Sequence, residues 1–104
     1  MIIRVFRAKV RPGKQKEFEQ LVKEQSIPLV RKQRGVLAQY AGRPVGSNSD
    51  EFTFVSVWDN LEDLKAFAGK DWEKSVIPPD ELPLLEETFI HHFELFHRDA
   101  RGSR

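Results

Sequence analysis

Three histidines near the C-terminus are the residues of this chain best suited to acid–base chemistry. His91, His92 and His97 lie in the segment 88–97, whose alternating pattern predicts a β-strand. Neighbouring residues of a strand point to opposite faces of the sheet, so at most one of His91 and His92 serves a given pocket. An imidazole is a natural general base for a phenol or an activated C–H group. The alternative for either residue is a structural histidine, hydrogen-bonded in an interface.

The same histidines are poorly spaced for a metal ion. His91 and His97 share a face but stand roughly 20 Å apart along a strand, so they cannot ligate one ion within a chain. His92 and Glu94 share the other face and offer only two ligands. The chain has no cysteine, which excludes thiolate zinc sites, iron–sulfur clusters, disulfides and a cysteine nucleophile. We therefore expect no metal site.

Trp58 is the strongest candidate for contact with an aromatic ligand. The run 52–58, FTFVSVW, predicts a strand, and Asp59 and Asn60 lead directly into an amphipathic helix that starts at Leu61. A connection this short places the helix against the sheet face that Trp58 occupies, where small-molecule pockets form. The indole is therefore either a pocket wall that stacks on a ligand or a core residue.

Other polar and aromatic side chains are expected to share this pocket. Gln25, on the apolar stripe of an earlier helix, could orient a ligand carbonyl or hydroxyl, or lie at the wet edge of that stripe. Arg4 has the strand parity of Trp58 and could bind an anionic oxygen, or lie exposed at a sheet edge. Trp72 is either a lid aromatic or an anchor for its segment. The remaining expected wall residues are Phe6, Phe54 and Phe67.

Four strands and two helices are needed to position these residues. The hydrophobic pattern predicts strands over 2–10, 36–42, 52–58 and 88–97. It predicts helices over 14–32, with a kink at Pro28, and over 61–68, with Asp59 or Asn60 as N-cap and Gly69 as the end. A short extra helix is expected over 71–77. The order βαββαβ is that of a ferredoxin-like α+β domain, with both helices on one face of an antiparallel sheet.

Both faces of the predicted sheet carry apolar residues. On the first and third strands the larger aromatics have even numbers, so the even face is expected to pack under the helices. On the odd face Ile3, Val5, Val55 and Val57 also need cover from water. A second copy of the chain would supply it, so we expect a homodimer that buries this face.

Length and charge bound the class of protein. The 104 residues suffice for one domain, expected over 1–97 and followed by a flexible tail over 98–104. Lys and Arg number 17 against 16 Asp and Glu, with both signs interleaved, which argues against a nucleic-acid partner. No apolar run is long enough for a membrane span and no signal-peptide pattern is present, so we expect a cytoplasmic protein without a membrane partner.

Several short motifs together carry a family resemblance. Ile2-Ile3 opens the first strand, the run AKVRPGK (8–14) leads into the first helix, and Gly35 precedes the second strand. Trp58 is followed by NLEDL (60–64), which opens the second helix. On these motifs the stretch from residue 1 to 96 resembles the antibiotic biosynthesis monooxygenase family of the dimeric α+β barrel group.

The resemblance implies a homodimer whose pockets lie between helices and sheet. Some members use O₂ to oxidise anthrone- or quinol-like aromatics without flavin, metal or haem; others degrade haem or isomerise small oxygenated substrates. In the first class the deprotonated substrate itself reduces O₂, and the protein supplies a dry cavity, orientation and a proton acceptor. No GxGxxG, Walker or HExxH motif is present. The resemblance thus implies a monooxygenase for a small aromatic substrate, with no cofactor, Trp58 as pocket wall and His91 or His92 as base.

Haem degradation is disfavoured within this resemblance. Haem-degrading members resemble one another in an Asn on strand one, a Trp that ends strand three and a His ligand after helix two. Here Trp58 matches, but Phe6 takes the Asn position and 71–77 contains no His. The Asn, Tyr and Arg typical of quinol-oxidising members are also missing, since only Phe54, Leu64 and Pro78 stand near those places.

Two alternatives to the monooxygenase stay open: a non-catalytic module for small-molecule binding or assembly, and an isomerase of the same fold. The catalytic hypothesis predicts an open, mainly apolar cavity on the helix side that contains a titratable group of shifted pKa. The binding-and-assembly hypothesis predicts instead that the aromatic residues fill this space to core density.

Overall fold

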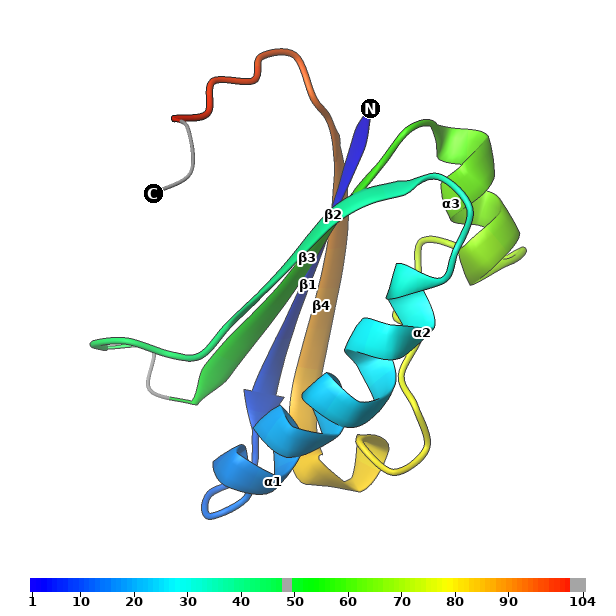
Figure 1. The fold of residues 1–104 in the computed structure, drawn as a ribbon. Coiled ribbons are helices and arrows are strands. Elements are labelled where there is room, and N and C mark those ends of the chain that lie inside the picture. The colour runs from blue at the N-terminus through cyan, green and yellow to red at the C-terminus, as the bar shows by residue number, and fades with distance from the viewer. Residues whose placement is uncertain (48–49, 102–104) are drawn as a thin grey trace.

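A four-stranded antiparallel sheet with helices on one face is the framework of the molecule (Figure 1). The structure is a computed structural model that describes residues 1–47 and 50–101. In chain order the elements are β1 (Ile2–Val10), α1 (Gln15–Leu21), η1 (Val22–Ser26), α2 (Ile27–Arg31), β2 (Val36–Gly42), β3 (Glu51–Trp58), α3 (Leu61–Ala68), η2 (Leu82–Leu84) and β4 (Leu85–Glu94). The strand order β2-β3-β1-β4 confirms the predicted ferredoxin-like α+β fold.

The first three strands follow the sequence pattern, whereas the fourth is shifted. β1 and β2 have the predicted bounds, and β3 begins one residue early. β4 runs over Leu85–Glu94 rather than 88–97. Pairing explains the shift, because the two ends of β4 lie opposite Ile2 and Val10, so that β4 spans the whole length of β1. The alternation of apolar and polar residues does not predict this extension, because Leu85 is followed by two acidic residues, Glu86 and Glu87.

The prediction of a short helix over 71–77 is wrong. This stretch consists of turns and irregular backbone. The carbonyls of Trp72 and Lys74 accept hydrogen bonds from the Arg4 side chain, at 2.7 and 2.9 Å, and are thereby withdrawn from any helical ladder. Prolines at 78 and 79 disfavour helical backbone in the residue before each of them. A turn follows, in which the Glu81 N–H donates to the Pro78 carbonyl at 3.0 Å, and the 3₁₀ helix η2 comes after it.

Beyond β4 the chain has no regular secondary structure as far as Arg101. His97, predicted to be in the last strand, therefore lies outside the sheet. Residues 102–104 of the predicted tail are outside the described residues. The domain boundary at residue 97 stays a prediction.

The helical segment from 15 to 31 changes its winding halfway along. α1 passes into the π-helix η1, and α2 then begins with Pro28 in its first turn. Proline has no N–H and its ring clashes with the carbonyl four residues earlier, so a wider turn ahead of it relieves the clash. The predicted break at Pro28 takes the form of this π-helical stretch. As a result the buried residues follow at intervals of four: Phe18, Val22, Ser26 and Val30.

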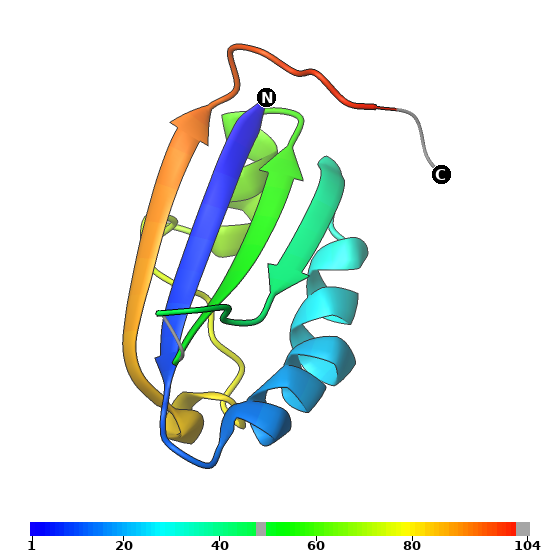
Figure 2. The ribbon, with the colours of Figure 1, turned by 90° about the vertical axis from the view of Figure 1, so that its left-hand side faces the viewer.

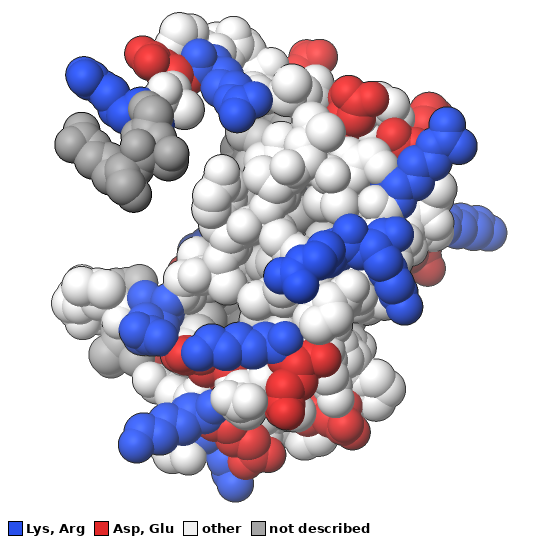
Figure 3. Space-filling view, viewed as in Figure 1, with Lys and Arg blue, Asp and Glu red and all other residues white. Residues whose placement is uncertain are grey.

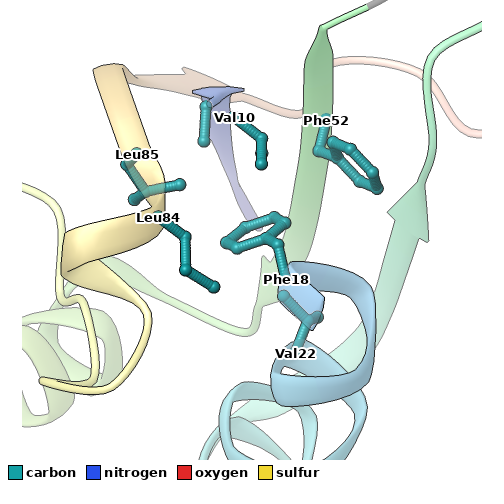
Figure 4. Packing of buried hydrophobic residues seen from close by; sticks show 7 residues of the cluster. Val10, Phe18, Val22, Phe52, Leu84 and Leu85 are labelled. Carbon is teal, nitrogen blue, oxygen red and sulfur yellow. The ribbon is translucent and has the colours of Figure 1, made fainter. Parts of the chain in front are cut away.

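Two hydrophobic clusters lie under the helices. The larger, here the Phe18 cluster, comprises Ala8, Val10, Phe18, Val22, Phe52, Leu84 and Leu85. Figure 4 shows Phe18 and Val22 of the helical segment directed toward the sheet and the start of β4. The rings of Phe18 and Phe52 meet edge to face, with centroids 5.2 Å apart. This cluster fastens the beginning of the helical segment to the sheet.

The smaller cluster, here the Trp58 cluster, joins Val30, Trp58 and Leu64. Trp58 and Leu64 are fully buried. Phe67 of α3 stacks on the Trp58 indole, with centroids 5.3 Å apart and an interplanar angle of 20°. The cluster holds α3 and the end of α2 against the end of β3.

Specific backbone contacts fix the position of α3. The Asn60 side chain accepts a hydrogen bond from the Asp63 N–H at 2.8 Å, which makes Asn60 the N-cap, and Gly69 ends the helix with φ of +83°. Gly35, with φ of +86°, lies so close to α3 that a Cβ there would overlap the Asp63 side chain. The Gly35 carbonyl also accepts from the Asp59 N–H at 2.8 Å.

Figure 2 shows the face of the sheet that no helix covers. One row across the four strands of this face consists of Tyr40, Val55, Val5 and His91. The next row consists of Ala38, Val57, Ile3 and Phe93. The tyrosine is 65% exposed and the phenylalanine 55%. The predicted division of the sheet by parity is confirmed, with the even face of β1 and β3 under the helices.

Candidate functional site

A cavity of about 450 Å³ lies between the helices and the sheet. Members of both clusters border it: Phe18, Val22 and Phe52 from one, Val30 from the other, and Phe54 and Phe67, which pack against the latter. Further walls come from β2, β4 and residues 76–81. The helix-side layer is therefore packed at its two ends and hollow between them, as the catalytic hypothesis predicts.

The polar groups of the interior gather at this cavity. In the described part of the chain the buried polar or charged residues are Arg4, Ser26, Ser56 and Glu81, and each of them lines the cavity. Buried polar groups are costly to place in an apolar interior, and they usually persist where they are hydrogen-bonded or functional. Their shared location marks the cavity as the candidate site.

Glu81 is a buried carboxyl group with a single side-chain partner. It is 3% exposed, and its Oε2 accepts a hydrogen bond from the Ser26 hydroxyl at 2.8 Å. Burial raises the pKa of Glu81 above its ordinary value, and the Ser26 hydrogen bond only partly opposes this. A carboxylate in such surroundings is a stronger base than one in water.

Neither Ser26 nor Glu81 is predicted from the sequence. The π-helical turn brings Ser26 inward, and the spacing of four from Phe18 through Val22 is the signal that would have found it. Glu81 follows two prolines in an irregular segment, where neither helical nor strand periodicity applies. No pattern in the sequence points to it.

Arg4 lies at the middle of the sheet and not at an exposed edge. Its strand, β1, is flanked by β3 and β4, and the residue is 6% exposed. Nη1 donates to the Trp72 carbonyl at 2.7 Å and to Nε2 of His92 at 2.8 Å, and Nη2 donates to the Lys74 carbonyl at 2.9 Å. The alternative of an exposed strand-edge arginine is therefore wrong.

His92 is the histidine on the helix side of the sheet, and His91 is on the uncovered face. Register places His92 beside Arg4, and His91 beside Val5. Burial, followed by the Arg4 charge, lowers the pKa of His92. Its Nε2 accepts from Arg4, so the neutral ring carries its proton on Nδ1. Neither histidine is among the residues that line the cavity.

Three charged side chains stand at the solvent side of the cavity. Arg43 donates to both carboxylate oxygens of Glu19, at 2.9 and 2.7 Å, and Lys23 lies 3.2 Å from the same carboxylate. These contacts lower the pKa of Glu19 to about 2. Figure 3 shows acidic and basic side chains side by side over α1, at the bottom of the view. The Arg43 and Lys23 side chains are mostly exposed, so the cavity reaches the surface beside them.

The cavity brings together some of the predicted site residues and leaves others out. Arg4, Phe6, Phe54 and Phe67 line it, whereas Trp58, Gln25 and Trp72 do not. The Trp58 indole is fully buried and donates to the Ser56 hydroxyl at 2.9 Å, one layer behind the cavity wall. Its predicted role in binding substrate stays a prediction.

Gln25 and Trp72 lie outside the cavity for different reasons. The wider π-helical turn directs Ser26 inward in place of Gln25, whose side chain donates to Asp80 at 3.0 Å. The Trp72 ring packs edge to face against His92, with centroids 4.9 Å apart, and Lys65 lies over it at 5.6 Å. Trp72 therefore supports the His92 and Arg4 side chains from behind.

Two features are not found within residues 1–47 and 50–101. No three His, Cys, Asp or Glu side chains stand close enough together to hold a metal ion. No helix in this part combines the length and apolar character needed to cross a membrane.

A scan against family models matches residues 1–73 to the model described as antibiotic biosynthesis monooxygenase. The chain belongs to this family. The family name describes a set of related domains, and individual members differ in what they bind and transform. No match was found among curated proteins.

Solved structures with the same fold include proteins of different activity. MhuD, a haem-degrader from Mycobacterium tuberculosis with two haems in its active site, is 18% identical with a TM-score of 0.74, over 96% of this chain and 100% of that one. A mutant of SnoaB, a cofactor-independent oxygenase from Streptomyces nogalater, is 17% identical with a TM-score of 0.69, over 93% and 94%. A conserved protein from Methanosarcina mazei Go1 is 24% identical with a TM-score of 0.70, over 89% and 91%. At these identities the likeness supports the shared fold alone.

Proposed function

We propose that this family member is a cofactor-independent monooxygenase that oxidises a small aromatic, quinol- or anthrone-like molecule inside the cavity. The observation that carries the proposal is the gathering of the buried polar residues, a carboxyl group included, around one mainly apolar cavity. Aromatic walls suit a flat ligand, and a few polar groups suffice to orient it. SnoaB, one of the proteins with a similar fold, is a cofactor-independent oxygenase, which supports the proposal.

Glu81 is the proton acceptor in this proposal, in place of the histidines that the sequence suggested. It lines the cavity, whereas His92 is engaged with Arg4 and His91 is on the far face. The Ser26 hydroxyl holds the carboxylate in a fixed orientation. Burial strengthens the base, as removal of a proton from a weakly acidic C–H or phenol requires.

The reaction balances without an added reductant. Glu81 takes a proton from the reactive ring carbon or its hydroxyl, and the resulting carbanion or phenolate passes an electron to O₂. The two radicals combine into a peroxide anion, which takes the first proton back from Glu81. Glu81 then accepts the second proton of the same carbon as the O–O bond breaks and a carbonyl forms. The departing hydroxide takes this proton from Glu81 and leaves as water. The walls exclude bulk water and align the reacting carbon.

Oxygen uptake tests the proposal. Purified chain is offered a panel of anthrones and hydroquinones, and uptake is measured against autoxidation without protein. Glu81→Gln should lower the rate by about a hundredfold or more, the usual contribution of a general base. Glu24→Gln, at an exposed position of η1, is the control and should leave the rate unchanged.

A different result would favour the alternatives. Ligand binding without uptake above autoxidation would indicate a binding module, and conversion of a substrate without O₂ consumption would indicate an isomerase. Oxygen uptake that is retained in Glu81→Gln but lost in His92→Gln would indicate that His92, and not Glu81, is the general base.

The proposal includes a homodimer formed through the uncovered face. The apolar rows on this face, with Tyr40 and Phe93 exposed, support it because isolated sheets rarely leave such a surface in water. Val57→Asp would bury an unpaired charge and should shift sedimentation toward monomer or aggregate. Lys16→Asp, on the exposed helix surface, is the control. A native chain that sediments as a monomer would contradict the dimer.

A further inference from the structure

Arg4 is a buried cation without a counterion in the described part of the chain. No carboxylate of residues 1–47 or 50–101 forms an ion pair with it. Its hydrogen-bond partners are two backbone carbonyls and a neutral imidazole. These partners hold the guanidinium in place but do not neutralise it. Burial alone lowers the pKa of Arg4 to about 10, so it stays charged at neutral pH.

The other acid of the cavity does not serve as that counterion. Burial and the Ser26 hydroxyl account for the pKa of Glu81, without a contribution from Arg4. The Glu19 carboxylate at the cavity mouth is held by Arg43 and Lys23. Arg4 is therefore a positive charge that no described carboxylate pairs with, and an anion in the cavity would be attracted to it strongly because the residue is buried.

The guanidinium retains donors for such an anion. Three of its five N–H groups make the hydrogen bonds described above, which leaves two without a partner among the described residues. The Trp72 and Lys74 carbonyls fix the plane of the group, so little side-chain entropy is lost when a ligand binds. Arg4 itself lines the cavity.

We propose that Arg4 binds an ionised oxygen of the ligand, so that the cavity selects aromatic acids or acidic enols and phenols in their anionic form. The inference rests on the cavity of the proposed function but makes a claim about binding alone. His92 and Trp72 are positioning residues in this scheme, because they hold the guanidinium and do not line the cavity. For an oxygenase, the same charge would stabilise the substrate anion formed on deprotonation.

Paired ligands of equal shape and different charge test the proposal. Isothermal titration calorimetry compares 2-naphthoate with 2-naphthamide, and ionised 2-hydroxy-1,4-naphthoquinone with 2-methoxy-1,4-naphthoquinone. The native chain should bind the anion of at least one pair about tenfold or more tightly, as expected for a charge-assisted hydrogen bond. The first pair reports on carboxylates and the second on enolates.

Variants at two cavity arginines locate the selectivity. Arg4→Gln should abolish the preference for the anion, and Arg4→Lys should retain part of it. Arg43→Gln, at the exposed mouth, is the matched control and should keep the preference intact. A purely structural role predicts instead that Arg4→Gln weakens both members of a pair equally.

The proposal has clear contrary outcomes. Equal affinity of the native chain for both members of both pairs would overturn it, and this measurement does not depend on whether Arg4→Gln folds. Loss of the preference in Arg43→Gln rather than in Arg4→Gln would move the site to the mouth. Oxygen uptake is measured separately, so a chain that selects anions but consumes no O₂ would refute the oxygenase and leave the anion site standing.

Discussion

The Trp58 cluster and the cavity beside it are built on the same sheet face, yet one is filled and the other is hollow. In the cluster, Trp58 and Leu64 have no exposed surface, and Phe67 stacks on the indole. In the cavity, the same layer holds Arg4, Ser26 and Glu81 around empty space. The filled cluster lies at α3 and the end of α2, whereas η1, with its π-helical turn, contributes Val22, Lys23 and Ser26 to the cavity wall.

This contrast separates the residues that stabilise the fold from those that are available for binding and chemistry. Apolar side chains that interdigitate give most of the stability of a small domain, and polar groups in a void give little of it. The two ends of the helix layer therefore hold the fold. The middle is where substitutions are expected to change chemistry before they change stability.

The largest expected effect is a difference between two leucines. Leu64→Ala in the Trp58 cluster should lower the free energy of unfolding by about 3 kcal/mol, because a fully buried side chain leaves a cavity. Leu29→Ala at the cavity wall should cost about 1 kcal/mol, since this side chain already borders empty space. Urea denaturation of both variants measures the pair. Equal losses would show that the cavity wall is packed as tightly as the cluster.

The next effect is a pH dependence that belongs to Glu81. Its raised pKa means that the folded chain holds this proton to higher pH than the unfolded chain. The resulting stability is complete below the unfolded pKa and is lost as the pH rises through the folded one. Glu81→Gln has no titrating group here, so its stability relative to the native chain should increase as the pH rises from the ordinary pKa of a glutamate, about 4.3, through the raised pKa of Glu81.

The size of that increase reports the surroundings of the carboxyl group. Each tenfold change in acidity corresponds to about 1.4 kcal/mol. Thermal melts of the native chain, Glu81→Gln and the exposed control Glu24→Gln across this pH range give the comparison. A flat difference for Glu81→Gln would show that Glu81 is solvated, and would remove the basis for its role as a base.

The smallest expected effect on stability is at the cavity mouth. Arg43→Gln breaks the hydrogen bonds to Glu19, but exposed ion pairs contribute little to folding, so the denaturation midpoint should stay within error. Both side chains line the cavity where it reaches the surface, so loosening their contact should speed ligand association, followed by stopped-flow fluorescence with the uncharged 2-naphthamide. An unchanged association rate would place the entrance elsewhere.

The sequence predicted the regular part of the molecule better than the site. Alternation placed β1 and β2, and the capping pattern placed α3, because these elements depend on local periodicity. Parity assigned Arg4 to the helix side in advance, and the structure agrees, whereas the choice between His91 and His92 required the register of β4 with β1. The family motifs in the sequence also predicted the fold.

What escaped prediction depends on contacts between distant segments. Ser26 replaces Gln25 only because Pro28 forces a wider turn, which α-helical spacing does not describe. Glu81 is buried by the tertiary fold, 55 residues from the serine that it accepts from. The Arg4 hydrogen bonds, in turn, keep 71–77 out of the helix that its composition suggested.

Gly35 lies against α3, the helix whose Phe67 lines the cavity. With no side chain, it lets the chain that leaves α2 touch the first turn of α3, and a Cβ there would push α3 away. The residues of the Trp58 cluster are closely packed and should move together with α3, whereas the cavity has empty space into which its wall can shift. A displacement of α3 at Gly35 should therefore shift Phe67, and with it the cavity wall, although Gly35 itself does not line the cavity.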